Sequence, residues 1–221
     1  YETAEGKRIS YHERAKYPDA LPRTVHADDV VWKNEKAVHP VDGFELLELT
    51  EKMSKSRGNV VNPDLVIDEY GADTLRLYEM FMGPLEQMKP WNPRNVGGVH
   101  RFLSRIWRLL CDEEGLSENI AETAADEETL RELHRTIKKV SEDTEEMRFN
   151  TAIAAMMEFV NFLYKLEKVP LSVVAPFVQL LAPYAPHLAE EVWQRLGNTT
   201  SIASVAWPIY HPAFLVSATY P

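Results

Sequence analysis

The strongest constraint on the fold is a series of apolar residues at helical spacing that begins after residue 62. Between residues 93 and 111 an apolar residue returns every three or four positions, which marks one side of a helix. This stripe consists of Val99, Phe102, Leu103, Ile106, Trp107 and Leu110. Helices that each bury one stripe must pack against one another, so the sequence predicts a helical bundle.

Residues that typically start and end helices divide this half of the chain. Asn62-Pro63 and Asn92-Pro93 each place an N-cap residue before proline at the first helical position, and Gly83-Pro84 is expected to end a helix near Met82. Beyond residue 111 the pattern predicts helices at 126–147, 150–168, 171–182 and 186–196. The first has an apolar stripe that ends at Met147, Asn150 is expected to cap the second, and Gly197 should end the last. Most connections are short, which favours antiparallel neighbours.

The first fifty residues are patterned differently. Asp42-Gly43 separates residues 36–41 from residues 44–49, which predicts a hairpin. We therefore expect a mainly α protein with a small α/β connecting region before an antiparallel helical bundle. The expected domains are residues 1–90 and 91–221.

Composition excludes several classes of protein. With 45% hydrophobic and 26% charged residues the chain is globular rather than disordered, and no apolar run reaches the roughly 18 residues of a membrane span. The net charge of −10 is uneven: residues 1–111 hold 16 basic and 17 acidic side chains, a net of −1, so this half can still bind phosphates. A single cysteine, Cys111, favours a reducing compartment, and we expect a cytoplasmic protein. The chain starts at Tyr1, and we expect it to be a piece of a longer protein.

The most informative segment is Lys52-Met53-Ser54-Lys55-Ser56, followed by Gly58. Small residues favour a mobile loop, and the two lysines supply compact charges that can follow phosphate oxygens. A solvated basic loop is the plainer interpretation of a Lys-x-x-Lys stretch. However, at about 5% per residue type the five-residue string would occur by chance on the order of 10⁻⁴ times in a chain of this length.

This string is identical to the signature loop of class I aminoacyl-tRNA synthetases. The segment that follows, Gly58 to Asn92, resembles the leucyl-tRNA synthetases of the bacterial type. Tyr70-Gly71-Ala72-Asp73 is an element that the valine and isoleucine enzymes share, whereas the run from Tyr78 to Glu86 is similar to the leucine enzymes. Residues 181–191 resemble the late bundle helices of the same subclass.

The resemblance implies an enzyme that joins leucine to tRNA(Leu) through adenylation by ATP and transfer to the terminal ribose. It also implies that the connecting region is a stem-contact fold that carries the signature loop, and that the helical bundle is of the class I anticodon-binding type. Lys55 would be the main ligand of the ATP phosphates, and Lys52, Ser54 and Ser56 would support phosphate contact and loop closure, with Mg²⁺ accompanying ATP. The family's other motif, His-Ile-Gly-His, is missing from these residues, as is a recognisable leucine pocket. We expect the isolated chain to be inactive, monomeric and without a membrane or a resident metal.

The helix expected at 93–111 also carries arginines on one face. Arg94, Arg101, Arg105 and Arg108 fall at offsets of 0, 7, 11 and 14. These residues are either an ordinary solvated face, or partners for the acids of a neighbouring helix, or contacts to the tRNA backbone. In the family that the chain resembles, the bundle after the loop binds tRNA, so the contact interpretation stays open beside the others.

Three alternatives remain. The chain could be a non-catalytic RNA-binding module derived from a class I synthetase, a valyl, isoleucyl or methionyl relative, or an unrelated helical protein.

His187 and Glu190, three residues apart, could share a metal, but a polar first turn after Pro186 explains them more simply. Cys111 is expected to be a buried core residue.

Overall fold

The computed structural model describes residues 1–25, 29–34, 36–49, 51–57 and 59–215, and the side chain of Ser56 and all of Gly58 lie outside that description. The chain forms two units, Tyr1–Asn62 and Pro63–Pro221. Packing thus divides the chain at 62/63, and the functional boundary expected at 90/91 remains a prediction. Helices dominate and sheets are small, which confirms the mainly α fold class.

The first unit is mostly irregular, with one hairpin. Strands β1 (Val31–Lys33) and β2 (Lys36–Val38) pair antiparallel. The Asp42-Gly43 turn forms as well, because His39 N–H donates to the Phe44 carbonyl at 2.8 Å and Gly43 has a φ of 69°. Its second arm contributes only an isolated bridge from Glu45 to Val38, so the expected hairpin is shorter than predicted and β2 pairs chiefly with the preceding strand.

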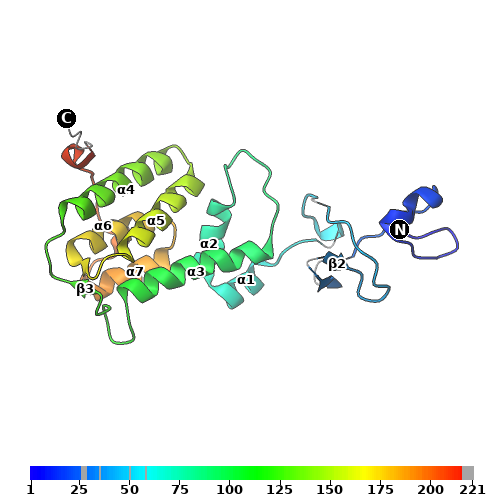
Figure 1. The fold of residues 1–221 in the computed structure, drawn as a ribbon, viewed down its shortest axis with the longest axis horizontal. Helices are drawn as coiled ribbons and strands as arrows, with labels where there is room; N and C mark the ends of the chain where they lie inside the picture. Colours follow the sequence, from blue (N-terminus) through cyan, green and yellow to red (C-terminus); the bar gives the residue numbers. More distant parts are fainter. Residues whose placement is uncertain (26–28, 35, 50, 58, 216–221) are drawn as a thin grey trace. The chain divides into compact units, whose positions relative to one another are not determined.

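The second unit holds seven α-helices among the described residues. They are α1 (Pro63–Tyr70), α2 (Ala72–Phe81), α3 (Pro93–Leu110), α4 (Glu127–Glu145), α5 (Phe149–Leu163), α6 (Leu171–Leu181) and α7 (Pro186–Arg195). A two-residue strand β3 (Ile120–Ala121) pairs in parallel with β4 (Val169–Pro170). In Figure 1, α4 and α5 lie side by side, joined by a tight turn.

The expected apolar stripes form the core of this unit. In α3 the side chains of Val99, Phe102, Ile106 and Leu110 are buried, and Trp107 is half-buried. They pack in one cluster with the buried faces of α2, α4, α5, α6 and α7. Cys111 is buried there too, and burial raises the pKa of its thiol, which confirms a core role.

Helix starts were predicted well where a side chain caps the backbone. Asn92 Oδ1 accepts the N–H of Arg94 at 3.0 Å, and Asp126 Oδ1 accepts the N–H of Thr129 at 2.7 Å. At the end of α7, Gly197 adopts a φ of 87° as expected. Short 3₁₀ segments complete the chain at Tyr11–Lys16, Lys55–Arg57, Ile202–Ser204 and Pro212–Leu215.

The prediction around the α4–α5 turn was wrong. Helix α4 ends before Met147, which has a φ of 57° and is exposed instead of belonging to the core stripe. The Arg148 N–H donates to the Asp143 carbonyl at 2.7 Å, the bond of a Schellman ending. Helix α5 then starts directly at Phe149, so Asn150 lies inside the helix and does not cap it.

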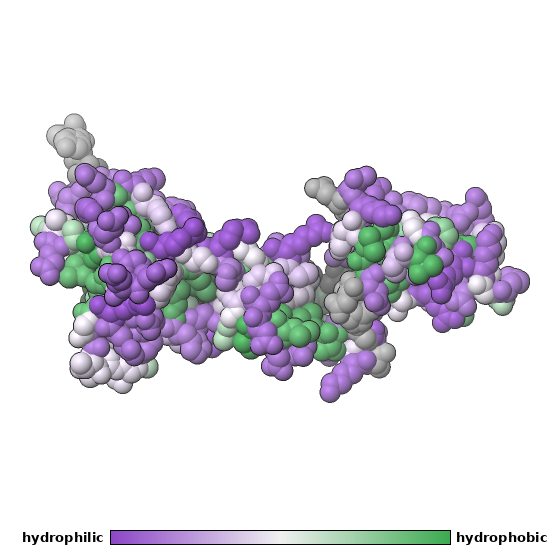
Figure 2. Space-filling model, turned by 90° about the horizontal axis from the view of Figure 1, so that it is seen from below, coloured by the Kyte–Doolittle hydropathy of each residue, from purple (hydrophilic) through white to green (hydrophobic). Residues whose placement is uncertain are grey.

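Helix α1 is unusual because none of its residues is buried. Leu65 and Ile67 are both exposed, and Figure 2 shows apolar side chains at the surface in this part of the unit. Elsewhere in that view the surface of the helical unit is mostly hydrophilic. The buried core of this unit is therefore formed by residues from α2 onward, and α1 contributes only partly buried residues to it.

Candidate functional site

The loop at Lys52–Ser56, called the signature loop below, is held by contacts at its base. Asn59 Oδ1 accepts the N–H of Ser54 at 2.8 Å, and Asn59 Nδ2 donates to the Lys52 carbonyl at 3.4 Å. Arg57 pairs with Glu51 at 2.8 Å across the same loop. One asparagine amide thus bridges both ends of the Lys52–Ser54 segment. It binds only backbone groups, and the side chains of Lys52 and Met53 remain exposed.

The two lysines of the signature loop stand exposed to solvent. Within the described part of the chain, neither ammonium group has a hydrogen-bond or ion-pair partner, whereas the neighbouring Arg57 is neutralised by Glu51. Lys55 opens the short 3₁₀ turn Lys55–Arg57, in which Arg57 N–H donates to the Ser54 carbonyl at 3.1 Å. The loop therefore presents two free positive charges on an ordered base, an arrangement suited to several anionic oxygens at once.

The four arginines Arg94, Arg101, Arg105 and Arg108, called the α3 arginine face below, all lie on α3 as predicted. Arg94, Arg101 and Arg108 are exposed, and Arg105 is half-buried. The Arg101 guanidinium lies beside two glycines of the same helix. A Cβ added to Gly97 would stand 3.5 Å from Nη1 of Arg101, and one added to Gly98 would stand 3.8 Å from Nη2. Arg108 Nε donates to the Ser104 carbonyl at 3.2 Å.

Helices α3 and α4 differ in how their charged side chains are paired. Residues 93–110 contain four arginines and no acidic residue. Among the described residues, Arg101, Arg105 and Arg108 have no carboxylate within ion-pair distance. Every cation of α4 is paired with an acid of the same helix; the pairs are Arg131–Glu127, Arg135–Glu132, Lys138–Glu142 and Lys139–Asp143. Within the described residues, Arg101, Arg105 and Arg108 are therefore not partners of a neighbouring acidic helix, which removes one of the three interpretations for these residues.

Arg105 has an aromatic partner instead. Its guanidinium carbon lies 4.7 Å from the ring centroid of Tyr164, at the end of α5, and the Tyr164 hydroxyl donates to the Arg105 carbonyl at 2.8 Å. No sequence signal pointed to Tyr164, because 59 positions separate it from Arg105. Asn59 was missed for a different reason: it follows the signature loop and resembles any loop asparagine.

His187 and Glu190 contact different groups of the protein. Its Nδ1 lies 2.8 Å from Asp73 Oδ1, and Glu190 accepts hydrogen bonds from Ser201 and from the Ile202 N–H. In the described ranges no three His, Cys, Asp or Glu side chains come together as metal ligands would. Over the same residues, no helix is both long and apolar enough to cross a bilayer.

Two family models match the chain. Residues 39–89 match "tRNA synthetases class I (I, L, M and V)", and residues 126–220 match "Anticodon-binding domain of tRNA ligase". The first match contains the signature loop, and the second begins at the cap of α4.

The curated and solved relatives are named as leucine–tRNA ligases. Leucine–tRNA ligases of Rhodopirellula baltica, Mycobacterium ulcerans and Chlorobium phaeobacteroides are 56%, 46% and 50% identical over 97%, 96% and 77% of this chain. The chain spans only 24%, 22% and 21% of their lengths. A crystal structure of the LeuRS–tRNA–LeuAMS ternary complex from Agrobacterium radiobacter superposes with a TM-score of 0.64 at 31% identity, over 75% of this chain and 23% of that one.

Proposed function

This chain belongs to the leucine–tRNA ligase family and spans 21% to 24% of the length of its relatives, and we propose that it is the part of such a ligase that carries two elements. These are the loop that binds the ATP phosphates and the helical bundle that binds tRNA. The complete protein joins leucine to tRNA(Leu) in two steps, adenylation by ATP and transfer to the terminal ribose. The observation that carries this proposal is the unaltered Lys52–Ser56 string, displayed on an exposed loop inside the segment that matches the class I synthetases.

The residues of the signature loop fit a triphosphate. Two exposed ammonium groups without carboxylate partners in the described residues attract anionic oxygens, and the Ser54 backbone is already fixed by Asn59. Lys55 would stabilise charge that develops on the transferring phosphate, with Lys52, Ser54 and Ser56 in support. The two lysine ammonium groups have no lone pair to offer a cation, and Mg²⁺ enters the proposal only as the ion that accompanies the ATP phosphates.

The α3 arginine face would bind the sugar–phosphate backbone of tRNA(Leu). Arginine forks match phosphate oxygens in geometry, and three of these guanidinium groups meet no acid within the part of the chain that the structure describes. The solved relative from Agrobacterium radiobacter is described as a complex with tRNA, which supports a nucleic-acid partner for this fold. We further propose that the complete protein is monomeric and cytoplasmic.

The substrate is tested with the complete protein that contains this chain. Exchange of pyrophosphate into ATP should depend on leucine and respond weakly to isoleucine, valine or methionine. A tRNA(Leu) transcript should then accept leucine. If the exchange followed one of the other amino acids, the chain would belong to that enzyme instead. If the complete protein bound tRNA(Leu) without any exchange, the non-catalytic RNA-binding module would be the correct interpretation.

A further inference from the structure

The contact between Arg105 and Tyr164 joins two helices that are distant in sequence. Tyr164 is the C-cap residue of α5, and its hydroxyl bonds to the backbone carbonyl of Arg105 while its ring lies against the guanidinium of the same residue. One side chain therefore contacts Arg105 at both its backbone and its charged end. Tyr164 as a whole remains 43% exposed, so its position does not come from burial in the core.

A second stacked arginine shows what a structural contact of this kind looks like. Arg195 lies 4.5 Å from the ring centroid of Trp107, but its hydrogen-bond donors are used within the protein. Its guanidinium donates to the Glu191 carboxylate at 2.8 Å and to the carbonyls of Asp112 and Gly115 at 2.6 and 2.9 Å. Arg195 thus binds protein groups with the edge of its guanidinium while the ring covers one face.

The guanidinium of Arg105 has no such partners. Within the described ranges it makes no hydrogen bond and no ion pair, although it is half-buried and stacked in the same way. A guanidinium that is held over a ring loses little further freedom when its free N–H groups bind an anion. The stacking therefore prepares Arg105 for an external ligand, and the ring supplies this geometry without competing for the N–H groups.

We propose that Tyr164 is a positioning residue for tRNA binding: it holds the Arg105 guanidinium for a phosphate of tRNA(Leu) and extends the contact surface from α3 to the end of α5. This inference rests on the proposed tRNA contact of the α3 arginine face. It assigns a role to a residue outside α3 that contributes no charge of its own.

The test is a double-mutant cycle on binding of a tRNA(Leu) transcript by the complete ligase. Tyr164→Leu should weaken binding about 2- to 5-fold, the effect of losing one exposed cation–π contact. In the Arg105→Gln background the same change should have almost no effect, because no guanidinium remains to be positioned. Tyr164→Phe, which keeps the ring, should bind within about twofold of the parent. Tyr164→Gln serves as a second ring-removing variant if Tyr164→Leu does not fold.

Matched controls distinguish the tRNA contact proposed for Arg105 from the positioning role proposed for Tyr164. Arg195→Gln removes the arginine that lies over Trp107 and should leave tRNA affinity unchanged, although it lowers thermal stability. If Arg105→Gln leaves tRNA affinity unchanged, the proposed tRNA contact at Arg105 is wrong. If Arg105→Gln weakens binding but Tyr164→Leu has no effect, or has an equal effect in both backgrounds, only the positioning role is wrong. Tyr164→Phe binding as weakly as Tyr164→Leu would also overturn it.

Discussion

Asp73, in the first turn of α2, accepts the backbone N–H of Leu188, in the first turn of α7, at 2.8 Å, although 115 residues separate them. The same carboxylate accepts the His187 N–H at 3.3 Å. Because α7 has no side-chain cap of its own at Ala185, Asp73 provides that cap from another helix. The Tyr70-Gly71-Ala72-Asp73 element and the late bundle segment 181–191, which resemble the family separately, thus meet in space.

Replacing this cap should destabilise the helical unit. Asp73→Ala leaves two N–H groups at the start of α7 without their acceptor and should lower the free energy of unfolding by about 1–2 kcal/mol, the usual cost of a lost N-cap. Urea denaturation followed by circular dichroism measures this. The exposed Asp68 of α1 is the control, and an Asp68→Ala change should lie within about 0.5 kcal/mol of the parent. Equal effects of the two substitutions would contradict the capping role.

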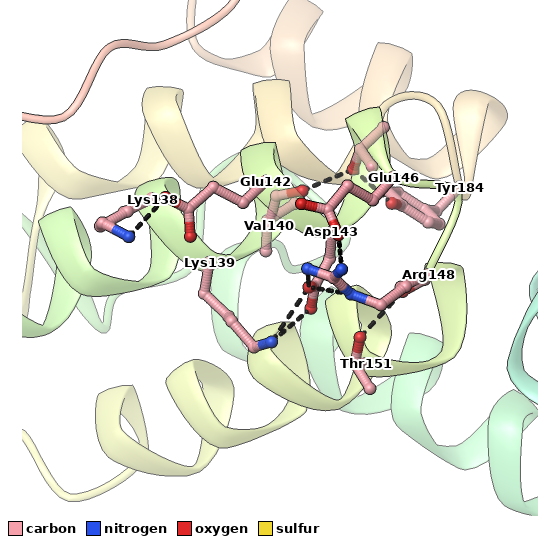
Figure 3. A network of polar contacts seen from close by, with 10 residues as sticks. Lys138, Lys139, Val140, Glu142, Asp143, Glu146, Arg148, Thr151 and Tyr184 are labelled. Carbon is pink, nitrogen blue, oxygen red and sulfur yellow. Dashed lines mark hydrogen bonds and ion pairs between the residues drawn. The ribbon is translucent and has the colours of Figure 1, made fainter. Parts of the chain in front are cut away.

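A second carboxylate, Asp143, predicts a dependence of stability on pH. Its side chain is fully buried at the end of α4, with Lys139 Nζ 2.8 Å from Oδ2 and the Arg148 guanidinium 2.8 Å from Oδ1. Figure 3 shows both cations pointing to this carboxylate. Burial raises the pKa of Asp143, but the bonds from Lys139, Thr151 and Arg148 outweigh it, so the pKa lies below the ordinary value of an aspartate.

The sign of the effect follows from that lowered pKa. The unfolded state takes up a proton at the ordinary pKa of Asp, about 4, while the folded state still resists it. Stability from this group should be complete above that pH and disappear as the pH falls through the lower folded value. Asp143→Asn should cost about 1–3 kcal/mol at pH 7 and much less near pH 2–3, as measured by urea denaturation at each pH. A difference independent of pH would show that the charge of Asp143 does not matter.

The signature loop gives a prediction for catalysis. In the complete ligase, Lys55→Ala should lower the adenylation rate about 10²–10³-fold, the range for removal of one preorganised charge stabiliser. Leucine binding should change little, because the lost contact is to phosphate. Lys55→Arg should rescue poorly, since a planar fork does not replace a compact ammonium group. Pre-steady-state pyrophosphate exchange measures the rate, and weaker leucine binding at an unchanged rate would contradict the phosphate role.

Asn59 should act on the same step but less strongly. Asn59→Ala removes the bridge between the Ser54 N–H and the Lys52 carbonyl while both lysines keep their charge. We expect the adenylation rate to fall about 3- to 10-fold, which corresponds to one hydrogen bond of ordinary strength, since the bond to the Lys52 carbonyl is long at 3.4 Å. The comparison is made with Lys55→Ala in the same assay. A loss as large as that of Lys55→Ala would mean that Asn59 itself contacts ATP.

The sequence predicted the parts of this fold that depend on neighbouring residues. The apolar stripe of α3 and the cap at Asn92 follow from local spacing and a local hydrogen bond, and both are present. Met147 was misplaced because a methionine occupies the left-handed position that usually holds glycine, so no residue type marked the end of α4.

The contacts that join distant segments could not be predicted in this way. Nothing near Asp73 indicates that it caps α7, and nothing near Tyr164 indicates Arg105. For the candidate site, the lysines of the signature loop and the α3 arginine face could be named from the sequence, because their residue types and spacing carry the signal. That Lys52, Lys55, Arg101, Arg105 and Arg108 have no acidic partner among the described residues could be learned only from the structure.

The most direct test of the tRNA contact is the salt dependence of tRNA binding by the complete ligase when Arg101 and Arg105 are both replaced by glutamine. Each lost phosphate contact should flatten the slope of log K against log salt by about 0.7–0.9, and different tRNA sequences should be weakened about equally. Leucine adenylation should not change. As a matched control, Arg131→Gln with Arg135→Gln removes two paired arginines of α4 and should leave the slope unaltered. A slope that stays the same after loss of Arg101 and Arg105 would contradict the account and remove α3 from the tRNA site.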